Sequence, residues 1–294
     1  MKTTIFTGSG TAIITPFTDS GVDFSKLEEL IEFQVHNKTD AIIVCGTTGE
    51  TPTMTKAEKE ATIKCVVKAT NERVPVIAGA GGNDTKAAIE ASKYAESVGA
   101  DAILSVVPYY NKPTQYGLYK HFEAIAKAVK TPIILYNVPG RTVVNLEPAT
   151  TIKLAEIDNI VAIKECVLSQ IAELAYAFQK NNFGIYTGDD PVFLPALAYG
   201  ATGVVSVMAN IIPKDTHMIH EHFIHNQIDV ARELQLKTLS LIKALFIESN
   251  PAPTKMALNL MGMNVGKCRL PISEMDPKNI EVLTKEMKKY GLLK

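Results

Sequence analysis

The feature that most constrains the fold is a series of eight short apolar segments separated by stretches with helical periodicity. Each segment is rich in β-branched residues and nearly continuous in apolar character, as expected of parallel strands buried on both faces. Their carboxyl ends lie roughly 20–35 residues apart, which leaves room for one helix and two loops per unit. The segments are 11–15, 41–45, 75–80, 102–107, 132–136, 160–164, 184–187 and 203–207.

The intervening stretches predict amphipathic helices, most clearly over 24–38, 56–71, 85–98 and 116–129. Asp84 stands where a helix cap is expected. Eight consecutive units favour an α/β fold of the closed (β/α)8 TIM-barrel type over an open doubly wound sheet. An open sheet usually carries a glycine-rich phosphate turn after its first strand, whereas Pro16-Phe17 follows the first segment here.

After Val207 the alternation of strands and helices stops. Helices are predicted over 229–246, 252–260 and 276–290, and no Ser/Gly-rich linker marks a separately tethered unit. We therefore predict a catalytic barrel over 1–225 and a small C-terminal helical region over 226–294.

Composition excludes several classes of protein. A net charge of -1 and a pI of about 6.6 provide no basic surface for nucleic acid. No apolar run approaches the roughly 20 residues of a membrane span, and the first ten residues lack the pattern of a secretory signal. The four cysteines form no CxxC pair. We expect a reduced cytoplasmic protein without a nucleic-acid or membrane partner.

Lys164 is the most informative polar residue, because it ends the buried segment 160–164. The active site of such a barrel lies at the carboxyl ends of the strands. Burial disfavours an ammonium and leaves free amine able to attack a ketone, which predicts Schiff-base chemistry. The alternative is a lysine that pairs with a barrel carboxylate and takes no part in a reaction.

Three further features stand at or after strand ends, on the same side of the predicted barrel as Lys164. Tyr136 is one strand from Lys164, so its phenol can donate and accept protons in the same space, or simply pack. Arg141 follows a Pro-Gly turn and suits a carboxylate ligand, unless it is only a solvated loop arginine. Residues 46–49 (GTTG) offer two hydroxyls and backbone N–H groups for a small anion, although threonine is also common in turns.

Together these residues belong to ordered motifs that resemble the N-acetylneuraminate lyase/dihydrodipicolinate synthase superfamily, and within it the dihydrodipicolinate synthase family. The resemblance covers essentially the whole chain. The motifs are 10–17 (GTAIITPF), 45–50 (CGTTGE), 108–113 (PYYNKP), 136–142 (YNVPGRT), 162–165 (AIKE) and 250–255 (NPAPTK).

The resemblance implies a reaction and a role for each site residue. Lys164 would form an imine with pyruvate, and the derived enamine would attack L-aspartate 4-semialdehyde to give 4-hydroxy-tetrahydrodipicolinate in lysine and diaminopimelate biosynthesis. Tyr136, Thr47 and Tyr110 would move protons, with Tyr110 reaching the neighbouring subunit's site. The resemblance further implies a homotetramer and no metal or organic cofactor, and no Rossmann fingerprint or Walker loop stands in the sequence.

The resemblance also assigns the carboxylates of the two substrates. Thr48 and the backbone of Val205 would hold pyruvate, and Arg141 would hold the semialdehyde. Sialic acid lyases typically carry Ser-Thr where Thr47-Thr48 stand and lack an arginine like Arg141, so these residues favour the synthase. A sugar-acid aldolase is the alternative, and a catalytically silent metabolite-sensing barrel is a third reading that the retained site residues disfavour.

Two other features concern metal binding and regulation. Four histidines lie close together in the sequence: His217, His220, His222 and His225. Ile224 stands where an HExxH motif needs its second histidine, so we expect a solvated polar helix without a metal.

In lysine-inhibited relatives a cleft with histidines and a glutamate binds lysine. Lys56, Lys59 and Ala87 occupy the corresponding positions here, and we expect weak or absent lysine inhibition.

Overall fold

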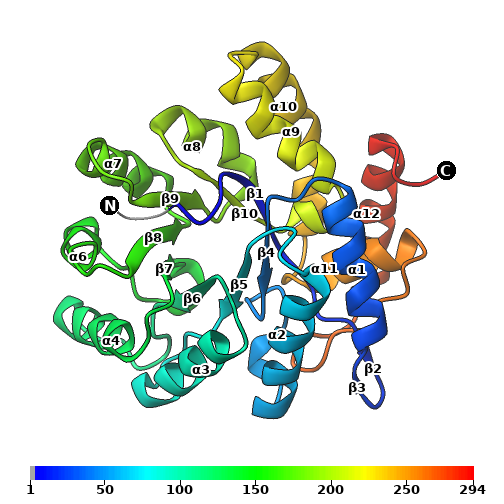
Figure 1. Ribbon diagram of the computed structural model, residues 1–294. Coiled ribbons are helices and arrows are strands. Elements are labelled where there is room, and N and C mark those ends of the chain that lie inside the picture. Colours follow the sequence, from blue (N-terminus) through cyan, green and yellow to red (C-terminus); the bar gives the residue numbers. More distant parts are fainter. Residues whose placement is uncertain (1–3) are drawn as a thin grey trace.

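A computed structural model describes residues 4–294 and shows a closed barrel of eight parallel strands (Figure 1). Around the barrel the order is β1-β10-β9-β8-β7-β6-β5-β4, so neighbours in sequence are neighbours in space and β1 closes the ring. The predicted (β/α)8 fold is confirmed. The strands are β1 (Gly8–Ala12), β4 (Ala41–Val44), β5 (Val76–Gly79), β6 (Ala102–Val106), β7 (Ile133–Asn137), β8 (Ile160–Glu165), β9 (Gly184–Thr187) and β10 (Gly203–Ser206).

Helices follow the strands and cover the outside of the barrel (Figure 1). In α1, the buried residues Leu27, Leu30, Ile31 and Gln34 recur at helical spacing and form one face toward the strands. Asp84 caps α3 as predicted, accepting hydrogen bonds from two backbone N–H groups. The barrel helices are α1 (Phe24–His36), α2 (Lys56–Thr70), α3 (Thr85–Ser97), α4 (Gln115–Ala128), α6 (Pro148–Leu154), α7 (Leu168–Phe178), α8 (Phe193–Tyr199) and α9 (Pro213–Ile224).

The first strand differs from the prediction. It covers Gly8–Ala12 rather than 11–15, because Gly8–Thr11 pair with β10 and Gly10–Ala12 pair with β4. Glycine and serine have low strand propensity, so Gly8-Ser9-Gly10 gave no strand signal. The close packing of the barrel requires glycine at position 10, since a Cβ at Gly10 would lie 2.7 Å from the side chains of Ile43 and Phe6.

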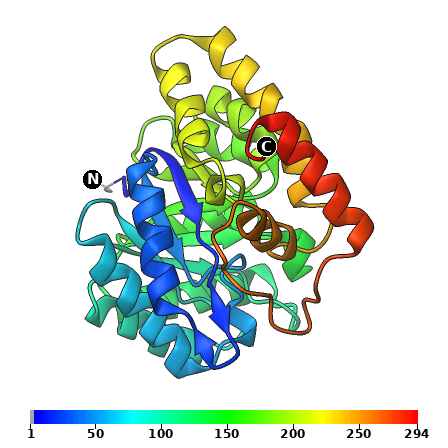
Figure 2. The ribbon, with the colours of Figure 1, turned by 90° about the vertical axis from the view of Figure 1, so that its right-hand side faces the viewer.

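The barrel also carries short elements that the hydrophobic periodicity does not predict. Strands β2 (Phe17–Thr18) and β3 (Gly21–Val22) form a hairpin beside α1 (Figure 2), and the one-turn helix α5 (Pro139–Thr142) follows β7. Three 3-10 turns, η1 (Thr51–Thr53), η2 (Asp190–Val192) and η3 (Met208–Asn210), stand after strands at the same end of the barrel.

Side chains fill the amino-terminal part of the barrel interior. Phe6 and Tyr186 stack with their ring centroids 4.3 Å apart, and the Tyr186 hydroxyl donates to the Phe6 carbonyl at 2.8 Å. Apolar side chains of Ile43, Ile77 and Ile134 pack above them inside the ring. This packing fills the amino-terminal end of the barrel interior, so the interior opens toward the carboxyl ends of the strands.

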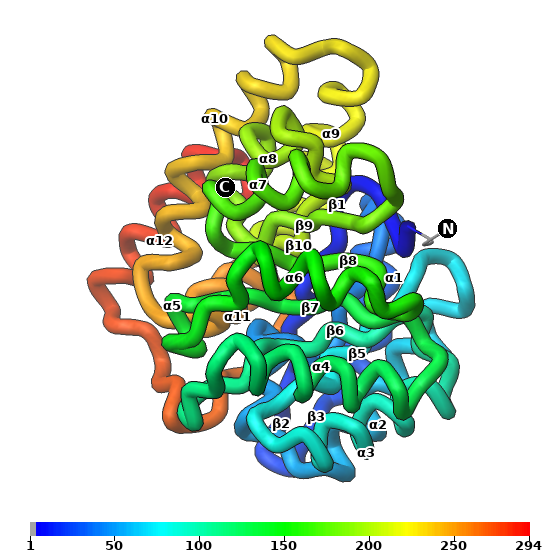
Figure 3. The backbone as a smooth tube through the Cα atoms, turned by 90° about the vertical axis from the view of Figure 1, so that its left-hand side faces the viewer, coloured from blue at the N-terminus to red at the C-terminus, as the bar shows by residue number. Residues whose placement is uncertain are grey.

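The C-terminal region consists of α10 (Ile228–Leu245), α11 (Ala252–Leu260) and α12 (Pro277–Tyr290). Helix α10 packs between α9 and α12, and α11 lies at the same end of the barrel as α5 (Figure 3). Because α9 completes the eighth unit, we retain 225 as the proposed boundary between barrel and C-terminal region. Within residues 4–294, no helix is both long enough and apolar enough to cross a membrane.

Candidate active site

Lys164 and Tyr136 stand side by side near the carboxyl ends of β8 and β7. The two residues are partners in the register of these strands, and Lys164 Nζ lies 4.3 Å from the centre of the Tyr136 ring. Both side chains are buried, with Lys164 only 7% exposed. The predicted proximity of lysine amine and tyrosine phenol is therefore confirmed.

No carboxylate among residues 4–294 forms an ion pair with Lys164, so the alternative of a charge-paired barrel lysine is wrong. The neighbouring Glu165 points to the opposite face, since successive residues of a strand alternate. There it accepts hydrogen bonds from Asn137 Nδ2, Gln170 Nε2 and the Val167 N–H. Burial raises the pKa of Glu165 to about 7, despite these donors.

Gly188, at the end of β9, gives the Lys164 side chain room. A Cβ at this position would lie 2.8 Å from Lys164 Cε and 2.4 Å from Cys166 Sγ. The lysine amine can therefore extend over the barrel mouth only because this neighbour has no side chain. Two residues after Gly188, Asp190 is buried and accepts hydrogen bonds from the N–H groups of Val207 and Met208, which fixes the end of β10.

The loop 46–50 after β4 presents backbone N–H groups toward the carboxyl end of the barrel. Turn hydrogen bonds use the N–H groups of Gly49 and Glu50. Within the described chain, the N–H groups of Thr47 and Thr48 donate no hydrogen bond, so both remain available to a ligand. Gly79, at the end of β5, lets the start of this loop pass close by, because a Cβ there would lie 2.0 Å from the carbonyl oxygen of Cys45.

Two adjacent cavities lie above these residues. An inner cavity of about 180 Å³ contains Lys164, Tyr136, Thr48 and Arg141, and an outer cavity of about 280 Å³ adds Tyr109 and Lys59. Thr47 and Arg141 line both. Arg141 reaches them from the short helix α5, which turns the chain back after the Pro-Gly step. The inner cavity thus combines the Lys164 amine, the Tyr136 phenol, two threonine hydroxyls, the Arg141 guanidinium and the Asp189 carboxylate.

The structure separates two predicted site residues from this group. Tyr110 is 89% exposed, has a φ of 72°, and lines neither cavity. Val205 is buried in β10 and also lines neither, whereas Val207, two residues later, contributes to the inner cavity. The roles assigned to Tyr110 and Val205 stay predictions.

Sequence reasoning missed the contribution of the C-terminal region. Phe246 and Asn250 line the inner cavity with Lys164, although both follow the last strand by about 40 residues or more of helical chain. Periodicity gives no signal for such a long-range contact. The NPAPTK motif beginning at Asn250 was the available clue.

The histidine-rich helix α9 is only partly the solvated helix that we predicted. His220 is buried and His217 is partly buried, with its Nδ1 2.9 Å from Asp40 Oδ2, whereas His225 is exposed. Within residues 4–294, no group of three His, Cys, Asp or Glu side chains is arranged to hold a metal ion.

We predict a pH-dependent stabilisation by His217. Its hydrogen bond to Asp40 raises the pKa of His217 above the usual range, so this stabilisation is complete below the unfolded pKa of about 6.5 and is lost as the pH rises through the folded pKa. His217→Gln should lower the free energy of unfolding by about 1 kcal/mol near pH 6 and by less near pH 9. Urea unfolding at both values measures this. The exposed His225→Gln variant is the control, and an equal loss at both pH values would contradict the prediction.

Comparison with known proteins identifies the group to which this arrangement belongs. The model of the dihydrodipicolinate synthetase family matches residues 5–290. The chain belongs to this family. The resemblance of the sequence motifs is thereby confirmed over nearly the full length, and the chain is an enzyme of this family.

Individual relatives agree with the family match. The 4-hydroxy-tetrahydrodipicolinate synthase of Acetivibrio thermocellus is 57% identical over 293 residues, covering 100% of both chains. The crystal structure of dihydrodipicolinate synthase from Aquifex aeolicus has a TM-score of 0.94 at 46% identity, covering 98% of this chain and 99% of that one. A monomeric dihydrodipicolinate synthase variant has a TM-score of 0.96 at 39% identity, with 98% of each chain covered.

Proposed function

We propose that the enzyme condenses pyruvate with L-aspartate 4-semialdehyde to give 4-hydroxy-tetrahydrodipicolinate, in the biosynthesis of lysine and diaminopimelate. The observation that carries this proposal is the unpaired amine of Lys164 over the Tyr136 ring, inside a cavity that also holds a guanidinium. The full-length identity to synthases of this name supports the same reaction.

Lys164 attacks the keto carbon of pyruvate, and loss of water gives the imine. A proton then leaves the methyl carbon, and the resulting enamine carbon attacks the aldehyde carbon of the second substrate. The amino group of that substrate closes the ring on the imine carbon and displaces Lys164 as free amine. The Tyr136 phenol, next to Lys164, is placed to carry the protons that these steps release and consume. The imine is itself the electron sink, so the reaction needs no cofactor.

The two carboxylates would occupy different parts of the site. Pyruvate has to lie at the bottom of the inner cavity, where the hydroxyl of Thr48 and the free N–H groups of Thr47 and Thr48 are available to its carboxylate. Arg141 spans inner and outer cavities and suits the carboxylate of the larger aldehyde. Val205 would contribute backbone to the pyruvate end.

A second copy of the chain would complete the proton relay. Tyr110 is exposed and held at positive φ, so we propose that it serves a neighbouring subunit through Thr47 in an assembly of at least two copies. A homotetramer is our expectation for this chain. The four free cysteines fit a reducing compartment, and we expect the reaction to run in the cytoplasm.

Two parallel assays test the proposed reaction. Pyruvate with aspartate semialdehyde, coupled to the reductase that consumes the product, should give turnover. Pyruvate with N-acetylmannosamine should give none. The reverse result would assign the enzyme to sugar-acid aldolases, which share the lysine and the tyrosine.

Arg141 should determine the affinity for the second substrate. Loss of a charge-assisted carboxylate contact costs about 1.5–3 kcal/mol, so Arg141→Leu should raise the KM for aspartate semialdehyde by roughly 10- to 100-fold. Borohydride trapping of pyruvate at Lys164 should not change. Arg141→Lys keeps the charge and loses the bidentate geometry, so its KM for aspartate semialdehyde should lie between those of the wild type and Arg141→Leu. If Arg141→Leu weakened pyruvate trapping as much as it weakened binding of the semialdehyde, this division of the site would be wrong.

A further inference from the structure

The C-terminal region supplies one buried polar side chain to the inner cavity. Asn250 is 3% exposed, lines the cavity with Lys164, and donates from Nδ2 to Thr48 Oγ1 at 2.9 Å. This hydrogen bond joins residues 202 positions apart in the sequence. It is therefore a contact between the carboxyl edge of the barrel and the segment that precedes α11.

The orientation of the Asn250 amide is set from its other side. Thr254 Oγ1, one helical turn later and fully buried, donates to Asn250 Oδ1 at 3.2 Å. With Oδ1 accepting this bond, Nδ2 faces Thr48 and makes the Thr48 hydroxyl oxygen an acceptor. A hydroxyl that accepts one hydrogen bond keeps its own proton free to donate elsewhere, and the open space beside Thr48 is the inner cavity.

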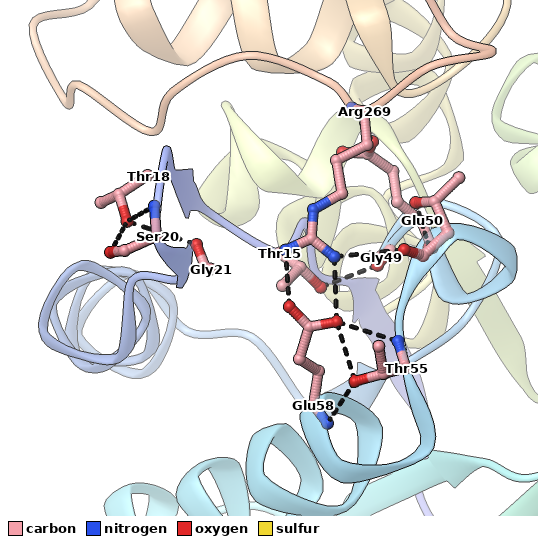
Figure 4. Close-up of polar contacts among 10 residues, drawn as sticks. Thr15, Thr18, Ser20, Gly21, Gly49, Glu50, Thr55, Glu58 and Arg269 are labelled. Atoms are coloured by element: carbon pink, nitrogen blue, oxygen red, sulfur yellow. Dashed lines mark hydrogen bonds and ion pairs between the residues drawn. The ribbon is translucent and has the colours of Figure 1, made fainter.

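The same C-terminal segment fixes the end of the loop that carries Thr48. Glu50, in the left-handed region at φ 56°, receives hydrogen bonds or ion pairing from Lys255 Nζ at 2.6 Å and from the Arg269 N–H at 2.8 Å. Arg269 then extends to Glu58 on α2 (Figure 4). The loop 46–50 is thus held at two points by residues 250–269.

We infer that Asn250 is a positioning residue for pyruvate capture, directing the Thr48 hydroxyl proton toward the carboxylate of bound pyruvate. The inference rests on the proposed role of Thr48. It predicts that Asn250 acts through Thr48 alone, and that the second substrate, which Arg141 holds, is unaffected. A residue that only stabilised the fold would show neither property.

A double-mutant cycle tests this coupling. The readout is the pyruvate concentration that gives half-maximal borohydride trapping at Lys164. Asn250→Ala and Thr48→Val should each raise it by about 5- to 30-fold, the effect of losing one or two kcal/mol. Asn250→Ala should add less than about twofold when Thr48 is already valine. The KM for aspartate semialdehyde should stay within about twofold in all variants.

The outcomes distinguish a failure of the positioning role of Asn250 from a failure of the proposed role of Thr48. If Thr48→Val leaves pyruvate trapping unchanged, the proposed role of Thr48 is wrong and the inference fails with it. If Thr48→Val weakens trapping but the two effects multiply in the double variant, only the inference is overturned.

A second variant covers the case in which Asn250→Ala does not fold. Thr254→Val is nearly isosteric, lines neither cavity, and removes the hydroxyl that orients the Asn250 amide. It should also raise the half-saturating pyruvate concentration, by less than Asn250→Ala, and not when Thr48 is valine. Unchanged trapping in this variant would overturn the inference.

Discussion

Replacement of Lys164 by alanine should remove every trace of covalent pyruvate capture and lower turnover by about 10⁴-fold or more, because Lys164 supplies the only amine among the residues that line the inner cavity. In the wild-type enzyme, borohydride with pyruvate should add the mass of pyruvate less one oxygen to the peptide that contains Lys164. The alanine variant should show no such adduct.

Lys59→Ala is the matched control, since Lys59 is a second lysine that lines the outer cavity. This variant should retain the adduct at Lys164. An adduct on any other lysine in the wild-type enzyme, or turnover by the alanine variant within tenfold of the wild type, would contradict the assignment of Lys164.

The structure shows why Lys164 and Tyr136 could be predicted from the sequence. Both end strands that follow one another in the chain, and consecutive units of a (β/α)8 barrel are neighbours in space, so strand ends converge at one edge. The β-branched runs located seven of the strands to within about two residues, because burial on both faces leaves a continuous apolar pattern.

Other parts of the site depend on contacts that no local pattern encodes. Asn250 reaches Thr48 only because the C-terminal helices pack across the carboxyl edge of the barrel. Gly188 matters through the space it leaves for Lys164, and a glycine in a sequence does not reveal what lies beside it. The strand at Gly8–Ala12 was displaced in the prediction because its glycines lack strand propensity.

The buried ion pair between Glu50 and Lys255 gives the second large expected effect. Lys255 is 1% exposed, lies over the Phe17 ring at 4.2 Å, and also donates to the Lys267 carbonyl. Burial lowers the pKa of Lys255, although Glu50 opposes this shift. Removing the cation leaves Glu50 buried without its countercharge, so Lys255→Met should reduce the free energy of unfolding by about 3–5 kcal/mol.

The loss should arise from the uncompensated Glu50 carboxylate rather than from the missing methylene packing, which methionine largely keeps. Adding Glu50→Gln to Lys255→Met should therefore recover part of the stability, since the buried charge is then gone and the amide oxygen still accepts from the Arg269 N–H. Chemical unfolding of the single and double variants measures this. The exposed pair of Lys267 and Glu274 provides the control, and Lys267→Met should change stability little. If the double variant were as unstable as Lys255→Met, the ion pair would not be what anchors the loop of Thr48 to the C-terminal region.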